Sequence, residues 1–166
     1  MKGDEDVVKY LNKALRAELM AADRYWLHSK LLEDWGFARL AAKQLAESAE
    51  ERQHADRLLD RVIFLGGAFL EGAPELQRNV SSKIGRGVKE ILKIDLDEEC
   101  AARALYMKAR ACCNEKSDYG SMRIFEDLIV DEEGHIDWLE TQLDLIKTIG
   151  LENYCQIQAV GADSDE

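Results

Sequence analysis

The sequence has 166 residues, enough for one domain with a sizeable hydrophobic core and no more. Its formal net charge of −11 argues against nucleic acid as a partner, because the phosphate backbone would be repelled, and favours a cation as the natural ligand. An acidic surface that only keeps the protein in solution explains this charge equally well, so the choice depends on residues at specific positions.

Nothing in the sequence predicts export or a membrane span. The chain begins MKGDEDVV, which is acidic and lacks the apolar run of a secretory leader. No segment approaches the roughly 18 consecutive apolar residues of a membrane helix. The cysteines form no CxxC pair, so we expect a cytoplasmic protein with reduced thiols and no thiolate metal site. Cys112 and Cys113 are interpreted as free thiols, with redox sensing as the alternative.

Helical periodicity runs through nearly the whole chain. The first predicted helix starts after Asp4 as its N-cap, reaches about Trp35 and is broken by Gly36. The second runs from about Ala38 to Leu65. The next predicted helix begins only near Val88, so a long irregular segment separates it from the second helix.

The third predicted helix covers about Val88–Glu115. Ser117 or Asp118 caps a fourth helix, which ends near Ile149 at Gly150. A short fifth helix covers about residues 152–158, and the polar tail 160–166 is expected to be disordered, which leaves residues 1–159 as the folded domain.

The lengths of the connections predict the topology. Short turns make the first and second helices antiparallel neighbours, and likewise the third and fourth. The segment 66–87 is long enough to run the length of a helix of about 42 Å, because an extended chain covers about 3.3 Å per residue. We therefore expect an all-α, up-down four-helix bundle of two antiparallel hairpins with one long crossover.

Two of the predicted helices carry the same short motif, Glu-x-x-His. The second helix has Glu51 and His54, and the fourth has Glu132 and His135. A spacing of three residues places Glu and His on one face of a helix. A single Glu-x-x-His is a weak signal that is common on solvated surfaces, but both motifs here lie within the apolar stripes of their helices, which predicts that they point inward.

The first and third helices each offer one inward carboxylate, Glu18 and Glu99. The same spacing of 33 residues separates Glu18 from Glu51 and Glu99 from Glu132. Adding 81 to the residue numbers of Glu18, Glu51 and His54 gives Glu99, Glu132 and His135. The same offset relates Tyr25 to Tyr106. In each hairpin the carboxylate and its partner motif are equidistant from the predicted turn, so all six groups are expected at one level of the bundle.

Four carboxylates in a low-dielectric core would repel one another and lose hydration. Two divalent cations would balance their four negative charges, and four carboxylates with two imidazoles suit iron or manganese. The alternative is a protonated, hydrogen-bonded polar layer that only specifies packing.

At this level of detail the sequence resembles the bacterioferritins over almost the whole chain, from MKGDEDVVKYLNKAL to LENYCQIQ. Stretches such as HADRLLDRVIFL and DEEGHIDWLETQLDLI carry the resemblance. It implies a ferritin-like bundle with a short fifth helix, and a ferroxidase centre at Glu18, Glu51, His54, Glu99, Glu132 and His135. It also implies that Glu51 and Glu132 bridge the metals, that Glu18 and His54 hold one iron, and that Glu99 and His135 hold the other.

The resemblance further implies a shell of 24 subunits around a mineral cavity, with oxygen or hydrogen peroxide as the oxidant of ferrous iron. In this family a methionine directly after the bridging glutamate of the second helix binds haem between paired subunits. The chain has Arg52 there, and a guanidinium that stays protonated cannot ligate haem iron. We therefore expect no haem from this chain alone, and leave open a homopolymer or a mixed shell with a haem-binding sister subunit. The crossover around residues 66–82 is also longer than is typical.

Several further side chains have two interpretations. Tyr25 is expected either to bond a ligand or donate an electron, or only to pack, whereas packing is favoured for Tyr106. Asp95 and Asp131 flank ligand positions and are expected either to orient the imidazoles or to have a solvated or capping role. His28 is interpreted as an exposed or interface histidine that binds no metal. Trp138 is assigned to core or ligand-side packing, and Trp26 and Trp35 to turn or subunit contacts. Through the resemblance, Cys155 and Gln156 are expected to lie near a channel.

Three functions fit the predicted site. The first is a cage that oxidises and stores iron. The second is a di-iron oxidase or peroxidase that mineralises nothing and needs no shell. The third is a non-catalytic subunit of a mixed shell, which the complete set of six ligand positions argues against.

Overall fold

The structure is a computed structural model that describes residues 1–67 and 83–159. In these ranges the backbone forms five helices: α1 (Glu5–Asp34), α2 (Ala38–Phe64), α3 (Val88–Glu115), α4 (Tyr119–Ile149) and α5 (Leu151–Ala159). The predicted all-α architecture is confirmed, and each helix end lies within a residue or so of its predicted position. The predicted disordered tail, 160–166, and most of the long crossover lie outside the described residues.

Local sequence signals explain where the helices begin and end. Asp4 caps α1, and its carboxylate accepts a hydrogen bond from the backbone N–H of Asp6. Gly36 and Gly150 follow α1 and α4 with positive φ angles, a conformation that glycine adopts without steric cost. Of the two residues predicted to cap α4, the structure selects Asp118, which accepts from the backbone N–H of Ser121.

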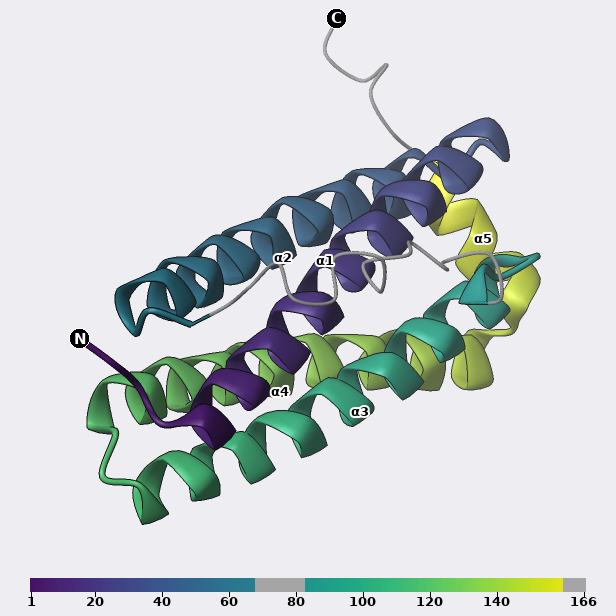
Figure 1. Cartoon of the computed structure of the whole chain (residues 1–166). Helices are drawn as coiled ribbons and strands as arrows, with labels where there is room; N and C mark the ends of the chain where they lie inside the picture. The colour runs from purple at the N-terminus through teal and green to yellow at the C-terminus, as the bar shows by residue number, and fades with distance from the viewer. Residues whose placement is uncertain (68–82, 160–166) are drawn as a thin grey trace, which may run out of the picture.

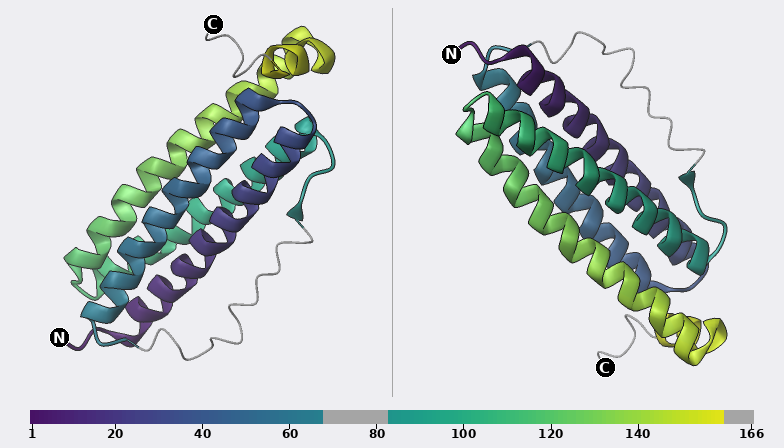
Figure 2. Two further views of the ribbon diagram at one scale, coloured as in Figure 1. Left: turned by 90° about the horizontal axis from the view of Figure 1, so that it is seen from above. Right: turned by 90° about the horizontal axis from the view of Figure 1, so that it is seen from below.

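The four long helices pack side by side, α1 against α2 and α3 against α4 (Figure 1). Helix α2 ends at the same end of the bundle where α1 begins, whereas α3 begins at the opposite end (Figure 2). The chain between α2 and α3 therefore connects opposite ends of the bundle, as the sequence predicted. Helix α5 turns away from the end of α4 and contacts both α4 and α2. None of the helices in the described ranges is long and apolar enough to span a membrane.

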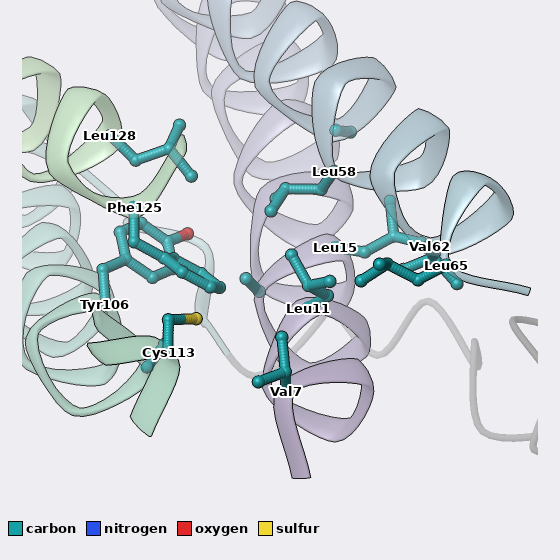
Figure 3. Close-up of a cluster of buried hydrophobic side chains, with 13 residues drawn as sticks. Val7, Leu11, Leu15, Leu58, Val62, Leu65, Tyr106, Cys113, Phe125 and Leu128 are labelled. Atoms are coloured by element: carbon teal, nitrogen blue, oxygen red, sulfur yellow. The ribbon is translucent and has the colours of Figure 1, made fainter. Parts of the chain in front are cut away.

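Two hydrophobic clusters fill the core, one at each end of the bundle. The first gathers side chains from the start of α1, the end of α2, the end of α3 and the start of α4, among them Leu11, Leu58, Tyr106, Phe125 and Leu128 (Figure 3). The second gathers Leu32, Leu40, Ile91, Leu92, Leu139 and Tyr154 at the other end. A layer of buried polar residues lies between the two clusters.

Candidate metal centre

The six predicted ligand residues converge in this polar layer, and each of their side chains is buried. The Nδ1 atom of His54 lies 3.0 Å from Glu51 Oε2 and 3.5 Å from Glu18 Oε2. The Nδ1 atom of His135 lies 3.4 Å from a carboxylate oxygen of Glu51 and of Glu132, and 3.7 Å from Glu99 Oε2. The two imidazole rings stack with their centroids 6.4 Å apart.

The cluster divides into two overlapping groups of potential metal ligands. One consists of Glu18, Glu51, His54 and Glu132, and the other of Glu51, Glu99, Glu132 and His135. Within each group the nearest ligand atoms all lie within 4.8 Å of one another. Glu51 and Glu132 belong to both groups, so the arrangement is that of two neighbouring cation positions with two carboxylates between them.

A hydroxyl group from the opposite hairpin holds each of the two unshared carboxylates. The Tyr25 hydroxyl on α1 donates to Glu99 Oε1 at 2.6 Å, and the Tyr106 hydroxyl on α3 donates to Glu18 Oε1 at 2.5 Å. The second oxygen of each carboxylate faces the interior of the cluster. For Tyr106 the expectation of packing alone is wrong, because this side chain packs against Phe125 and also bonds a ligand carboxylate.

The pKa values of the cluster's acids shift in opposite directions, because burial and neighbouring carboxylates raise them whereas the imidazoles lower them. Burial, and the neighbouring charge of Glu51, raise the pKa of Glu18 to about 8. Burial and the proximity of Glu99 likewise hold the pKa of Glu132 well above its ordinary value. Burial alone would also raise the pKa of Glu51, but the two neighbouring imidazoles hold it well below the usual range.

The carboxylates around the two imidazoles raise the pKa of both rings. Burial would lower the pKa of His54, but hydrogen bonds to Glu18 and Glu51 raise it to about 10. His135 is affected in the same direction, because Glu132, Glu47 and Glu51 outweigh the effect of burial and raise its pKa strongly. Without metal the cluster thus lowers its net negative charge by binding protons, which a divalent cation would have to displace.

Several ligand atoms lack ordinary hydrogen-bond partners. Among the described residues, Glu51 Oε1, Glu132 Oε2 and His135 Nδ1 are buried without one. Buried polar atoms are normally paired, so three unpaired donor and acceptor atoms that face one another indicate room for a missing ligand. Oxygen and imidazole nitrogen donors of this kind suit iron or manganese.

A cavity of about 220 Å³ lies between α1 and α3 and reaches the cluster. Glu18, Glu51, Glu99 and Glu132 lie along its wall, together with Arg24. The carboxylates are therefore accessible to small ions and molecules from this side of the bundle.

The sequence-based interpretation missed Glu47. This buried carboxylate lies 2.8 Å from Nε2 of His135 and pairs with Lys43, and the exposed Glu50 lies 3.7 Å from the same nitrogen. A signal was present, because the apolar stripe of α2 continues through Leu40, Gln44, Glu47, Glu51 and His54 at alternating spacings of four and three residues.

The predicted exposed or interface position of His28 is wrong, because this side chain is fully buried. Its Nδ1 atom lies 3.1 Å from Asp95 Oδ1, and the backbone N–H of Gly85 donates to its Nε2. Asp95 consequently orients His28 and not one of the two cluster imidazoles, and it also accepts hydrogen bonds from Arg24 and Gln44. Asp131, by contrast, lies 3.4 Å from Nε2 of His54, as expected for a residue that orients this ring.

The three tryptophans lie at different depths in the bundle. Trp138 is half-buried against the second hydrophobic cluster, with Lys43 Nζ 5.1 Å from its ring centre. Trp35 caps the end of α1, and Trp26 is half-exposed. Arg52, at the position where the resemblance places a haem-binding methionine, lies on the α2 surface with its guanidinium 3.7 Å from Asp23.

The cysteines of this structure are unpaired. Cys113 is buried in the first hydrophobic cluster, and this burial raises the pKa of its thiol to about 12. A buried, protonated thiol is a poor nucleophile, so packing explains Cys113 better than redox sensing.

Comparisons with known proteins agree with the fold. The family model of the ferritin-like domain matches residues 8–149. The chain is 50% identical to the bacterioferritin of Brucella melitensis biotype 1 and 46% identical to that of Rhodobacter capsulatus, in each case over the full length of both proteins. It is 40% identical to the bacterioferritin of Mycobacterium avium over 93% of this chain and 94% of that protein. By its fold, its buried carboxylate–histidine cluster and this full-length similarity, the chain belongs to the bacterioferritins of the ferritin-like family.

Proposed function

We propose that the chain is a ferroxidase that oxidises Fe(II) to Fe(III) at the six-residue cluster and stores the product as a ferric mineral. Membership of the bacterioferritins supports iron storage. The observation that carries the proposal is the presence of two buried four-residue ligand groups that share Glu51 and Glu132. Such an arrangement holds two ions side by side, which suits the simultaneous oxidation of a pair.

In this proposal Glu18 and His54 hold one iron, Glu99 and His135 hold the other, and Glu51 and Glu132 bridge them. The three buried ligand atoms without hydrogen-bond partners among the described residues belong to the bridging carboxylates and to His135. Four carboxylates balance the charge of two ferrous ions, and their hard oxygen donors favour the ferric state further. Each ferrous ion gives up one electron, and oxygen or hydrogen peroxide accepts them.

Hydrogen bonds from outside the cluster would keep its ligands in place before iron arrives. Tyr25 and Tyr106 each occupy one oxygen of Glu99 and Glu18, which leaves the other oxygen available for a metal. Asp131 and Glu47 lie beside the outer nitrogens of His54 and His135, so that the inner nitrogens face the cations. Tyr25 is also close enough to the cluster to donate an electron during oxidation.

The assembly belongs to the same proposal. We expect a shell of 24 subunits in the cytoplasm, formed by this chain alone or together with a sister subunit that binds haem. Arg52 would give the homopolymer no haem ligand at that position, because its guanidinium stays protonated. Size-exclusion chromatography with light scattering tests the shell, since a small oligomer would favour an oxidase that stores nothing. The absorption spectrum of the same sample reports haem.

The catalytic assignment is tested by stopped-flow oxidation of Fe(II) by oxygen and by peroxide. Replacing Glu51 or His54 with alanine should abolish the rapid phase of oxidation. Glu133→Ala is the matched control, because Glu133 is an exposed neighbour of Glu132 that pairs with Arg103. A rapid phase that survives unchanged in purified, assembled Glu51→Ala and His54→Ala proteins would refute the assignment.

A further inference from the structure

The two halves of the cluster are related by the 81-residue offset between the hairpins, but their surroundings are not. On one side a buried polar network extends the cluster toward the second hydrophobic cluster. It consists of Arg24, His28, Gln44 and Asp95, each at most 4% exposed. The offset carries these residues onto Leu105, Ala109, Phe125 and Ala14, all apolar and all in or against the first hydrophobic cluster.

Arg24 connects this network to a ligand. Its Nε lies 3.0 Å from Asp95 Oδ1, and its Nη2 lies 3.4 Å from Glu99 Oε1. Asp95 is held on its other sides by Gln44, at 3.0 Å, and by His28. The Nη2 end of the guanidinium is therefore the part that faces the cluster.

His28 helps to fix the position of Asp95 in this network. The N–H of Gly85 donates to its Nε2, so Nε2 is the unprotonated nitrogen and Nδ1 carries the hydrogen that Asp95 accepts. Asp95 thus accepts bonds from three side chains, which fixes its carboxylate and, through it, the position of Arg24.

Because Arg24 has no counterpart in the other hairpin, Glu18 and Glu99 have different surroundings. Each accepts one hydrogen bond from a tyrosine hydroxyl, but only Glu99 also has a guanidinium within 3.4 Å. The residue that corresponds to Arg24 beside Glu18 is Leu105. A permanent positive charge beside a ligand carboxylate draws its electrons away from a metal and repels a dication in the low-dielectric interior.

Two further carboxylates near this half of the cluster are each paired with a lysine, so neither offsets Arg24 fully. Glu98 Oε2 lies 3.9 Å from Nη1 of Arg24, but Lys83 pairs with the same carboxylate. Glu47 lies beside the outer nitrogen of His135, but Lys43 pairs with the same carboxylate, so its charge is balanced locally. Asp95 partly balances Arg24 at its Nε, where the two atoms are 3.0 Å apart, whereas Nη2 faces Glu99 Oε1 at 3.4 Å.

We propose that Arg24 makes the two metal positions unequal: it is a positioning residue that weakens divalent-cation binding at the Glu99–His135 position relative to the Glu18–His54 position. The two positions then fill in order, the Glu18–His54 position first. This inference rests on the proposed function, because it assigns different affinities to the two halves of the same centre.

Titration of the full-length, assembled protein with Co²⁺ under metal-free buffer conditions tests this order. Co²⁺ reports binding by its absorption spectrum and needs no oxidation. The wild-type protein should bind two ions per chain in two steps separated by at least about tenfold in affinity, because interior charges a few ångströms apart interact strongly. Arg24→Gln should bring the two steps together, whereas Arg24→Lys, which keeps the charge, should keep them apart.

Variants that keep only one of the two metal positions show which position Arg24 affects. In Glu18→Ala, which leaves the Glu99–His135 position, Arg24→Gln should raise the Co²⁺ affinity about tenfold by removing the adjacent charge. In Glu99→Ala, the same substitution should leave the affinity unchanged. Arg110→Gln is the matched control, because Arg110 pairs with Glu126 away from the cluster.

The outcomes separate this inference from the proposed function. Equal effects of Arg24→Gln in the two backgrounds, or no effect in either, would overturn the role of Arg24 and leave the function standing. Wild-type protein that binds no Co²⁺ at the cluster would overturn the function itself. If Arg24→Gln does not fold, the double variant Arg24→Gln/Asp95→Asn removes both buried charges. Its Co²⁺ titrations then have the same expected and contradicting outcomes.

Discussion

The Tyr25 hydroxyl donates a 2.6 Å hydrogen bond across the bundle to Oε1 of Glu99. Tyr25 is on α1 and Glu99 is on α3, so the contact joins the two hairpins at the level of the metal centre. Its counterpart, from Tyr106 to Glu18, runs in the reverse direction. Each hairpin thus supplies a ligand and also orients a ligand of the other hairpin.

Removal of the Tyr25 hydroxyl should therefore impair the centre without unfolding the bundle. We expect Tyr25→Phe to reduce Fe(II) oxidation about 10- to 100-fold, the usual cost of losing a hydrogen bond that orients a metal ligand. Stopped-flow oxidation measures the effect. Tyr10→Phe is the control, because Tyr10 packs against the first hydrophobic cluster without contacting a ligand. An oxidation rate as high as that of the control would show that Glu99 needs no such bond.

The sequence predicted the helices and the six inward groups because both depend on regular spacing within a helix. Glu51 and His54, or Glu132 and His135, share a face through a three-residue step, and the equal offsets within each hairpin place them opposite Glu18 and Glu99. These relationships need no knowledge of side-chain conformation.

The contacts that the sequence did not predict join residues from different hairpins. His28 has no partner at ligand spacing on its own helix, and its partner Asp95 is 67 residues away. Tyr106 was expected only to pack for a similar reason, since the carboxylate that it bonds, Glu18, is 88 residues away. Such contacts depend on how the hairpins face each other, which spacing within one helix does not determine.

The metal-free protein should lose stability as the pH rises from about 6.5 to about 8. The pKa of Glu18 rises from 4.5 to about 8 on folding, and that of His54 from 6.5 to about 10. In this window the folded state holds more protons than the unfolded state, so raising the pH favours unfolding.

Added divalent metal should reverse this trend, because it takes the place of the protons. Thermal unfolding in EDTA and in Co²⁺ across this pH range measures both effects, and the gain from Co²⁺ should grow with pH. Glu18→Gln should flatten the slope of the metal-free protein. A metal-free melting temperature that rises across this window would contradict the assigned charges.

Leu58 should be one of the costliest positions to truncate. It is fully buried in the first hydrophobic cluster (Figure 3). Leu58→Ala should reduce the free energy of unfolding by about 2–5 kcal/mol, because a cavity replaces the lost side chain. Lys93→Ala, on the exposed face of α3, should change it by no more than about 0.5 kcal/mol. Chemical denaturation compares the two, and equal midpoints would show that the cluster relaxes around the cavity.

The turn between α3 and α4 depends on Asp118. Its Oδ1 accepts from the backbone N–H of Ser121 at 3.0 Å and from Arg61 Nη2 at 2.6 Å. Asp118→Ala should cost about 1–3 kcal/mol, because it removes an N-cap and leaves a half-buried guanidinium without its carboxylate. Asp118→Asn keeps the cap and should cost less. Denaturation midpoints rank the two variants, and a larger loss for the asparagine variant would contradict this account.

Six side chains are expected to hold two iron ions inside the bundle. Anomalous diffraction from crystals soaked anaerobically in ferrous salt tests this expectation most directly. We predict two peaks per chain, one between Glu18 and His54 and one between Glu99 and His135, with Glu51 and Glu132 between them. Crystals that show no iron among these side chains, or iron only beside the exposed Glu50, would contradict the account.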